Sequence, residues 1–119
     1  MTGRISPNFI EVRQGDSFNI ILQFKDEQNF IDISGSSIKM QVRNCKDKKI
    51  AFTKIGEIDD AIKGKAHISL IPSDTKNLDL ETDYITDIQI TFANGEVHTI
   101  YPQDCNRVAS FIITQNVTE

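Results

Sequence analysis

The sequence predicts an all-β fold in which two layers of antiparallel strands enclose one hydrophobic core, a β-sandwich. Apolar and polar residues alternate through most of the 119-residue chain, which is the pattern of half-buried strands. Turn-forming residues separate the alternating runs at short intervals, and no strand-helix-strand alternation supports a parallel sheet. We therefore expect about seven to eight short strands, with at most one short helical turn.

The early alternating runs supply one apolar face each. Residues 17–25 and 37–44 are the clearest, and residues 64–71 form a third run that Pro72 ends, because proline cannot donate to a β-ladder. Their expected inward-facing side chains are Phe18, Ile20, Leu22, Phe24, Ile38, Met40, Val42, Ala66, Ile68 and Leu70.

Residues 72–80, "PSDTKNLDL", are the one helix-like piece of the chain. We expect a single turn capped by Ser73, with Leu78 or Leu80 packing beneath it. The piece is too short to form a helical layer.

Residues 83–101 predict a β-hairpin. Its first strand alternates from Tyr84 to Phe92, and its second strand alternates from Val97 to Tyr101. Asn94-Gly95 between them predicts a two-residue type I′ turn, in which both residues have positive φ. In the closing run, residues 107–115, Val108 shares the face of Phe111 and Ile113 only if the strand contains a bulge or changes face.

Length and composition indicate one domain, residues 1–119. Residues of the AVILMFWYC set make up 39% of the chain and charged residues 25%, enough for one core and untypical of disorder. The formal net charge is −4, so we expect no nucleic acid partner. We expect no membrane association and no export, because residues 1–12 contain no hydrophobic signal core and no run is apolar enough to span a bilayer.

Positive charge gathers in residues 39–65, which hold eight Lys or Arg against four Asp or Glu, a net of +4. One interpretation is a solvated, lysine-rich hairpin tip. The other is a basic face that docks an acidic partner, such as the acidic face of a neighbouring copy. The candidate docking residues are Arg43, Lys46, Lys48 and Lys49, around the charged turn 44–49.

We find no motif that indicates an enzyme or a cofactor. His67 and His98 stand alone in alternating strands, without the Cys and His spacing of a zinc site. The acidic run Asp79–Asp83 fails as a calcium loop, because Tyr84 and Ile90 occupy the positions that need glycine and glutamate. We therefore expect no catalytic residue, no metal and no cofactor.

The two cysteines, Cys45 and Cys105, form no CxxC motif. We expect them to stay reduced, although a bridge between them stays open if their strands are neighbours.

Four marks in residues 13–44 and 84–114 resemble a known family. They are an Arg-x-Gly-Asp turn (Arg13–Asp16), an Ile-Asp-Ile-Ser-Gly link (Ile31–Gly35), a Met-Gln-Val-Arg strand (Met40–Arg43), and Tyr84 and Asp87 ahead of Asn94-Gly95. The chain resembles the immunoglobulin-like β-sandwich domains of tailed-phage and prophage structural proteins, and is similar to the N-terminal domain of baseplate upper proteins. Cys45 in the turn and Cys105 depart from that pattern.

The resemblance implies a non-enzymatic structural or assembly protein of the virion, in its tail, baseplate or head, made in the bacterial host cytoplasm. Its implied partners are other virion proteins, with a homo-oligomer as a further option, and it transfers no active-site residue. The alternative function is a carbohydrate-binding or host-surface-binding sandwich module. Sugar sites use exposed aromatic side chains as platforms. This chain is poorly supplied with them, because it has no Trp and its two tyrosines are Tyr84 and Tyr101.

Overall fold

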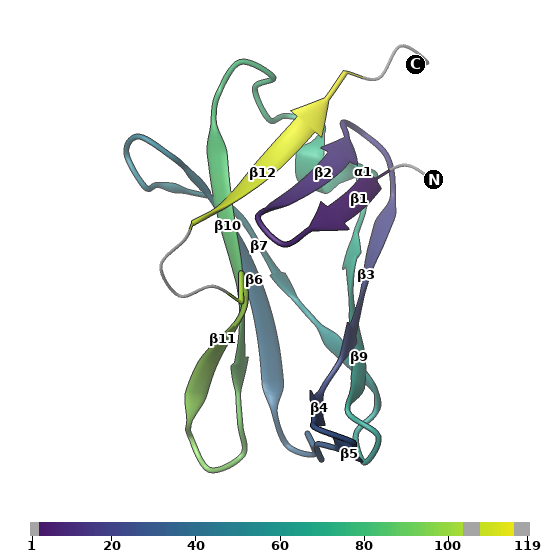
Figure 1. Cartoon of the computed structure of the whole chain (residues 1–119). Coiled ribbons are helices and arrows are strands. Elements are labelled where there is room, and N and C mark those ends of the chain that lie inside the picture. Colours follow the sequence, from purple (N-terminus) through teal and green to yellow (C-terminus); the bar gives the residue numbers. More distant parts are fainter. Residues whose placement is uncertain (1–2, 104–107, 116–119) are drawn as a thin grey trace.

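The protein is described by a computed structural model that covers residues 3–103 and 108–115. Figure 1 shows two β-sheets facing each other along the length of the molecule, with the hydrophobic core between them. The principal extents are 42 × 29 × 21 Å.

The larger sheet has seven strands in the order β1-β2-β12-β10-β6-β7, and β11 also pairs with β10. β10 is paired along one side by β6. Its other side is shared by β12, opposite Tyr84–Thr86, and β11, opposite residues 88–91. Among the described strands one pairing is parallel, that of β12 with β2. The bounds are β1 Gly3–Ser6, β2 Phe9–Arg13, β6 Ser37–Asn44, β7 Ile50–Ile55, β10 Tyr84–Thr91, β11 Val97–Tyr101 and β12 Ala109–Thr114.

The smaller sheet has three strands in the order β3-β9-β8, and a two-stranded hairpin of β4 and β5 follows β3. One helical turn, α1, follows β9. The bounds are β3 Phe18–Gln23, β4 Lys25–Asp26, β5 Asn29–Phe30, β8 Glu57–Asp60, β9 Lys65–Leu70 and α1 Pro72–Thr75.

These strand orders are those of an immunoglobulin-like β-sandwich. β3, β9 and β8 take the places of strands B, E and D, while β12, β10, β6 and β7 take those of G, F, C and C′. The predicted all-β, immunoglobulin-like sandwich with one short helical turn is therefore confirmed. The described residues hold twelve strands, more than the seven or eight expected, because several are pieces of two to five residues.

Period-two alternation predicted the core correctly. Ile38, Met40 and Val42 on β6 are at most 1% exposed, and Tyr84, Thr86, Ile88 and Ile90 on β10 are all buried. On β3 and after it, Ile20 and Phe24 are buried while Phe18 and Leu22 are half-buried at the rim of the core. Ala109 and Phe111 face the core from β12, so Val108 points outward and the strand needs no change of face.

The predicted N-cap of the helical turn was wrong, whereas the expectation that Leu78 or Leu80 packs beneath the turn is confirmed. α1 begins at Pro72, and its N-cap is Ile71 rather than Ser73, because the Asp74 carboxylate accepts a hydrogen bond of 2.7 Å from the Ile71 N–H. Leu78 packs against the core, whereas Leu80 is exposed.

The tip of the β10–β11 hairpin is a three-residue loop rather than a type I′ turn. The Phe92 N–H donates to the Glu96 carbonyl, and the Gly95 N–H donates to the Phe92 carbonyl. Gly95 has a φ of 92°, whereas Asn94 does not have positive φ. A three-residue loop needs a left-handed backbone at its last residue alone, so glycine is required at Gly95 while Asn94 accepts the Glu96 N–H with its side chain.

Candidate functional site

The predicted docking residues lie together at the turn between β6 and β7, residues 44–49, which we call the basic tip. Arg43 is the second-last residue of β6, and Lys46, Lys48 and Lys49 are exposed in the turn that follows. Asn44 holds this turn closed, because its N–H donates to Lys49 O and its carbonyl accepts from the Lys48 N–H, both at 2.9 Å. The basic tip is therefore an ordered turn.

Two of the four basic side chains help to hold this turn. Arg43 donates to Lys48 O and to the Gln41 side chain at 2.9 Å, and Lys48 Nζ donates to Cys45 O at 2.7 Å. Lys48 also has a φ of 63°, a left-handed backbone that is unusual for lysine. Lys46 and Lys49 take part in the turn through their backbone N–H groups, so they are the side chains best placed for outward contacts.

An acidic loop lies beside the basic tip. The Cys45 N–H donates to the Asp83 carbonyl at 2.8 Å, which joins the turn to the segment that holds Asp79, Glu81 and Asp83. This end of the sandwich therefore presents positive and negative side chains next to each other. Cys45 is half-buried there, whereas Cys105 lies outside the described residues, so the redox prediction stays a prediction.

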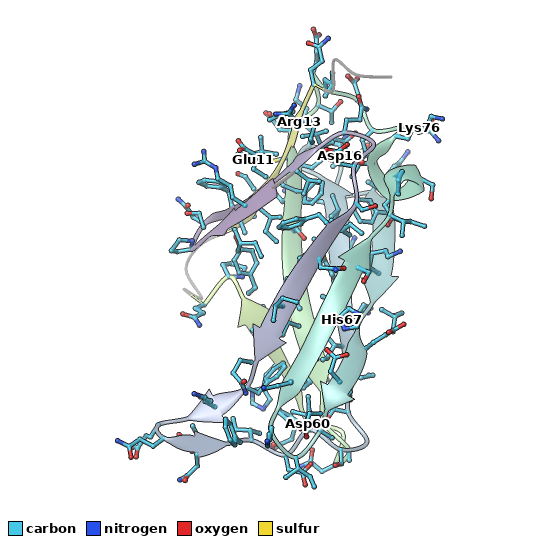
Figure 2. All side chains as sticks on the ribbon, turned by 90° about the vertical axis from the view of Figure 1, so that its right-hand side faces the viewer. Glu11, Arg13, Asp16, Asp60, His67 and Lys76 are labelled. Atoms are coloured by element: carbon cyan, nitrogen blue, oxygen red, sulfur yellow. The ribbon has the colours of Figure 1, made fainter. Side chains whose placement is uncertain are left out.

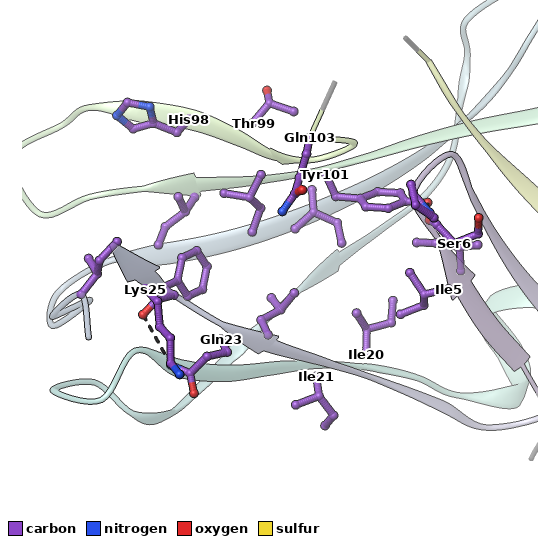
Figure 3. Close-up of a pocket in the computed structure, with 18 of the residues that line it drawn as sticks. Ile5, Ser6, Ile20, Ile21, Gln23, Lys25, His98, Thr99, Tyr101 and Gln103 are labelled. Atoms are coloured by element: carbon purple, nitrogen blue, oxygen red, sulfur yellow. Dashed lines mark hydrogen bonds between the residues drawn. The ribbon is translucent and has the colours of Figure 1, made fainter. Parts of the chain in front are cut away.

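A second candidate surface, which the sequence analysis did not identify, is an open groove of about 1330 Å³ between the two sheets. We call it the edge groove. Residues 20–24 line one wall and residues 98–101 of β11 line the other, while Ile88 and Ile90 of β10 lie between them. Figure 3 shows His98, Thr99 and Tyr101 across the groove from Ile20 and Ile21, with Ile5 and Ser6 at one end.

Tyr101 closes the end of the edge groove that lies next to β1. Its hydroxyl donates a hydrogen bond of 2.8 Å to the Ser6 carbonyl, which ties the end of β11 to the end of β1. Burial raises the pKa of Tyr101 to about 12, so the hydroxyl remains a neutral donor at ordinary pH. Tyr84 is 9% exposed, and its hydroxyl accepts from the Asp79 N–H at 3.1 Å.

His67 forms the most polar cluster on the smaller sheet. It lies on β9 (Figure 2), and its Nδ1 is 2.8 Å from Asp59 Oδ2 while its Nε2 is 3.5 Å from Glu57 Oε2. The hydrogen bond to Asp59 raises the pKa of His67, and the charges of Asp59 and Glu57 add to that effect. The two carboxylates meet opposite nitrogens of the ring, so they do not converge on one point where a metal ion could bind.

Within residues 3–103 and 108–115, no group of three or more His, Cys, Asp or Glu side chains has an arrangement that could hold a metal ion. The described part of the chain also has no helix of sufficient length and apolarity to cross a membrane.

Comparisons with known proteins add the following. No protein-family model matches the chain, and no curated protein sequence matches it. A solved structure of murine CRIg is similar at 10% sequence identity, over 95% of this chain and 97% of that chain, with a TM-score of 0.43. At that level of similarity the comparison contributes nothing on function.

Proposed function

We propose that the chain is a non-enzymatic structural domain of a tailed-bacteriophage virion, in the tail, baseplate or head, that assembles through protein–protein contacts. Its partners are other virion proteins or further copies of itself, and it is made in the cytoplasm of the bacterial host. The observation that carries the proposal is the basic tip, a hydrogen-bonded turn that exposes Lys46 and Lys49 at one end of the sandwich.

An ordered tip favours docking because little conformational entropy is lost when its partner binds. The hydrogen bonds of Asn44, Arg43 and Lys48 already fix the backbone of the turn, so the points from which Lys46 and Lys49 project are set before a partner binds. The adjoining acidic loop gives the surface both signs of charge, which favours one orientation of the partner over others.

The sequence marks of the phage resemblance also have structural roles. Met40–Arg43 lies in β6, an interior strand of the larger sheet, and Ile33 of the Ile31–Gly35 link is fully buried. The Arg13–Asp16 turn leads from β2 to β3 and docks on α1 through Gly15. These are features of architecture, in keeping with a domain whose work is assembly.

The carbohydrate-binding alternative has less support. Tyr84 is buried, and Tyr101 is half-buried with its hydroxyl bonded to Ser6, so neither ring forms an exposed platform for a sugar. An array of glycans separates the two functions, since specific binding to a glycan would favour the alternative.

The test of the proposal is incorporation into particles. In the phage or prophage that encodes the chain, Lys46→Glu combined with Lys49→Glu should abolish incorporation, measured by mass spectrometry of purified particles. Lys48 is left intact because its side chain holds the turn.

The matched control is Lys63→Glu combined with Lys65→Glu, which makes the same change of charge on exposed residues of the β8–β9 turn and the start of β9. This control should leave incorporation unchanged. Normal incorporation of the tip variant would remove the docking role of the basic tip, and absence of the wild-type protein from particles would remove the virion role itself.

A further inference from the structure

Consecutive residues line both walls of the edge groove, which distinguishes it from a pocket over one face of a sheet. Side chains on a strand alternate between the two faces, so a hollow above one face is lined by every second residue. Here five consecutive residues, 20–24, line one wall and four, 98–101, line the other. The groove therefore runs along strand edges, where backbone N–H and C=O groups are exposed.

β3 is an edge strand without a partner on the groove side among the described residues. All six of its residues pair with β9 in unbroken register, from Phe18 opposite Leu70 to Gln23 opposite Lys65. In an antiparallel ladder, alternate residues direct their N–H and C=O groups away from that partner. The free side of β3 thus offers a row of donors and acceptors along the groove.

The edge of β3 lacks the features by which proteins protect exposed edges, namely charged side chains, proline and bulges. The other outer strands have them. β1 carries Arg4, β7 carries Lys54, β8 carries three acidic residues, and β11 has a bulge at Ile100, which has no partner on β10. The β3 sequence FNIILQ has no charge, no proline and no break in its register.

We propose that the edge groove binds an extended, mainly apolar segment of a partner protein, which joins the smaller sheet as a fourth strand beside β3. The inward side chains of this segment pack on the half-buried Leu22, Ile31 and Ile100. Its backbone satisfies the free N–H and C=O groups of β3, and this mode of recognition is strand addition.

The shape of the groove selects this occupant. A volume of about 1330 Å³ exceeds the roughly 300–1,000 Å³ that small ligands fill. The groove lies between the two sheets, so a strand that is free of its own sheet can enter it. An edge strand of a second folded copy would bring its own sheet with it, and that sheet would have to fit past the β11 wall.

This inference is independent of the basic tip and of the virion role, because it uses different residues and can be tested on the isolated chain. The probe is a displayed library of random peptides of about ten residues, enough to exceed the length of β3. Enriched peptides should alternate apolar and polar residues and should contain few charges.

Hydrogen exchange of the complex with one such peptide locates the binding. The amides of Phe18–Gln23 that point away from β9 should gain protection, whereas β8, the opposite edge of the same sheet, should not. N-methylation of alternate peptide residues removes the donors that face β3, so one of the two alternate sets should weaken binding by at least about tenfold.

A matched pair of variants tests the contact from the protein side. Ile21 lines the groove and is 74% exposed, while Ile62 lies in a turn outside the groove and is 73% exposed. Ile21→Lys should weaken peptide binding by about three- to fivefold, because it replaces an apolar cross-strand neighbour, and Ile62→Lys should not change it.

Three outcomes overturn the proposal. They are a library with no enriched peptide, a peptide whose binding protects residues other than those of β3, and a stable dimer of the chain that protects β3 by itself. The third outcome would assign the edge to a second copy.

Discussion

The backbone N–H of Gly15 donates a hydrogen bond of 2.9 Å to the side-chain hydroxyl of Thr75. Beside it, the Gln14 amide donates to the carbonyls of Thr75, Lys76 and Leu78. The turn after β2 thereby bonds carbonyls at the end of α1 and just beyond it, which a helix of four residues cannot satisfy internally.

Thr75→Val should lower the free energy of unfolding by about 1–3 kcal/mol, because it keeps the shape of a fully buried side chain while the Gly15 N–H loses its acceptor. Urea denaturation measures the difference. Thr53→Val, at an exposed position on β7, is the control and should change stability by less than about 0.5 kcal/mol. Equal effects of the two variants would show that the buried bond contributes nothing.

Asp74 joins α1 to the other sheet. Its carboxylate accepts from the Ile71 N–H at 2.7 Å and lies 3.0 Å from Lys54 Nζ on β7, with both side chains mostly buried. Asp74→Ala removes both contacts and should cost about 1.5–3 kcal/mol of unfolding free energy. Asp74→Asn keeps an acceptor for Ile71 and should cost less.

The contribution of the ion pair to the free energy of unfolding can be measured with a double-mutant cycle of Lys54→Met and Asp74→Asn, followed by urea denaturation. We expect a favourable coupling of about 0.5–3 kcal/mol, since the two residues touch. A coupling of zero would mean that Lys54 stabilises the protein through packing alone.

The strands and the core were predictable from the sequence because burial in this protein follows period two. Ile38, Met40 and Val42 on β6, for example, are almost fully buried, as their alternation indicates. The helical turn was predictable from Pro72 and the residues after it, but its N-cap was not, because Ile71 has no capping side chain. Its N–H is bonded by the Asp74 carboxylate, which also pairs with Lys54 on a strand distant in sequence.

The candidate surfaces were predictable to different degrees. The cluster of Lys46, Lys48 and Lys49 is local in sequence, so the basic tip could be located, but the bonds of Arg43 and Lys48 to the turn depend on its fold. The edge groove depends on how β11 and β12 share β10, a tertiary pairing that no local pattern encodes. A weak signal was available in retrospect: β3 and β11 carry no charged residue.

Two glycines with positive φ should differ in their tolerance of alanine. Gly95→Ala at the hairpin tip meets no atom within 4 Å, so its cost should be the left-handed backbone alone, about 1–2 kcal/mol. A Cβ on Gly64 would lie 2.5 Å from Phe24 O and 2.8 Å from Ile31 O. Gly64→Ala should therefore cost clearly more, as measured by thermal denaturation.

The same series tests the geometry of the loop. Asn94→Ala should be milder than Gly95→Ala, because Asn94 lacks positive φ and loses one exposed hydrogen bond to Glu96. The opposite order would indicate that both residues adopt left-handed conformations, as in a type I′ turn.

The His67 cluster should make stability depend on pH. Its carboxylate neighbours raise the pKa of His67 in the folded protein above the ordinary value of 6.5. A raised folded pKa means that the contribution to stability is complete below about 6.5 and is lost as the pH rises through the folded pKa. The difference in unfolding free energy between wild type and His67→Gln should thus be larger at acid pH than at alkaline pH. Urea denaturation of both proteins from about pH 5 to pH 9 measures this difference. The contributions of the other titrating groups cancel, because both proteins contain them. Asp59→Asn removes the nearer carboxylate and should flatten the dependence, whereas a difference that is constant with pH would exclude a charged His67 in the folded protein.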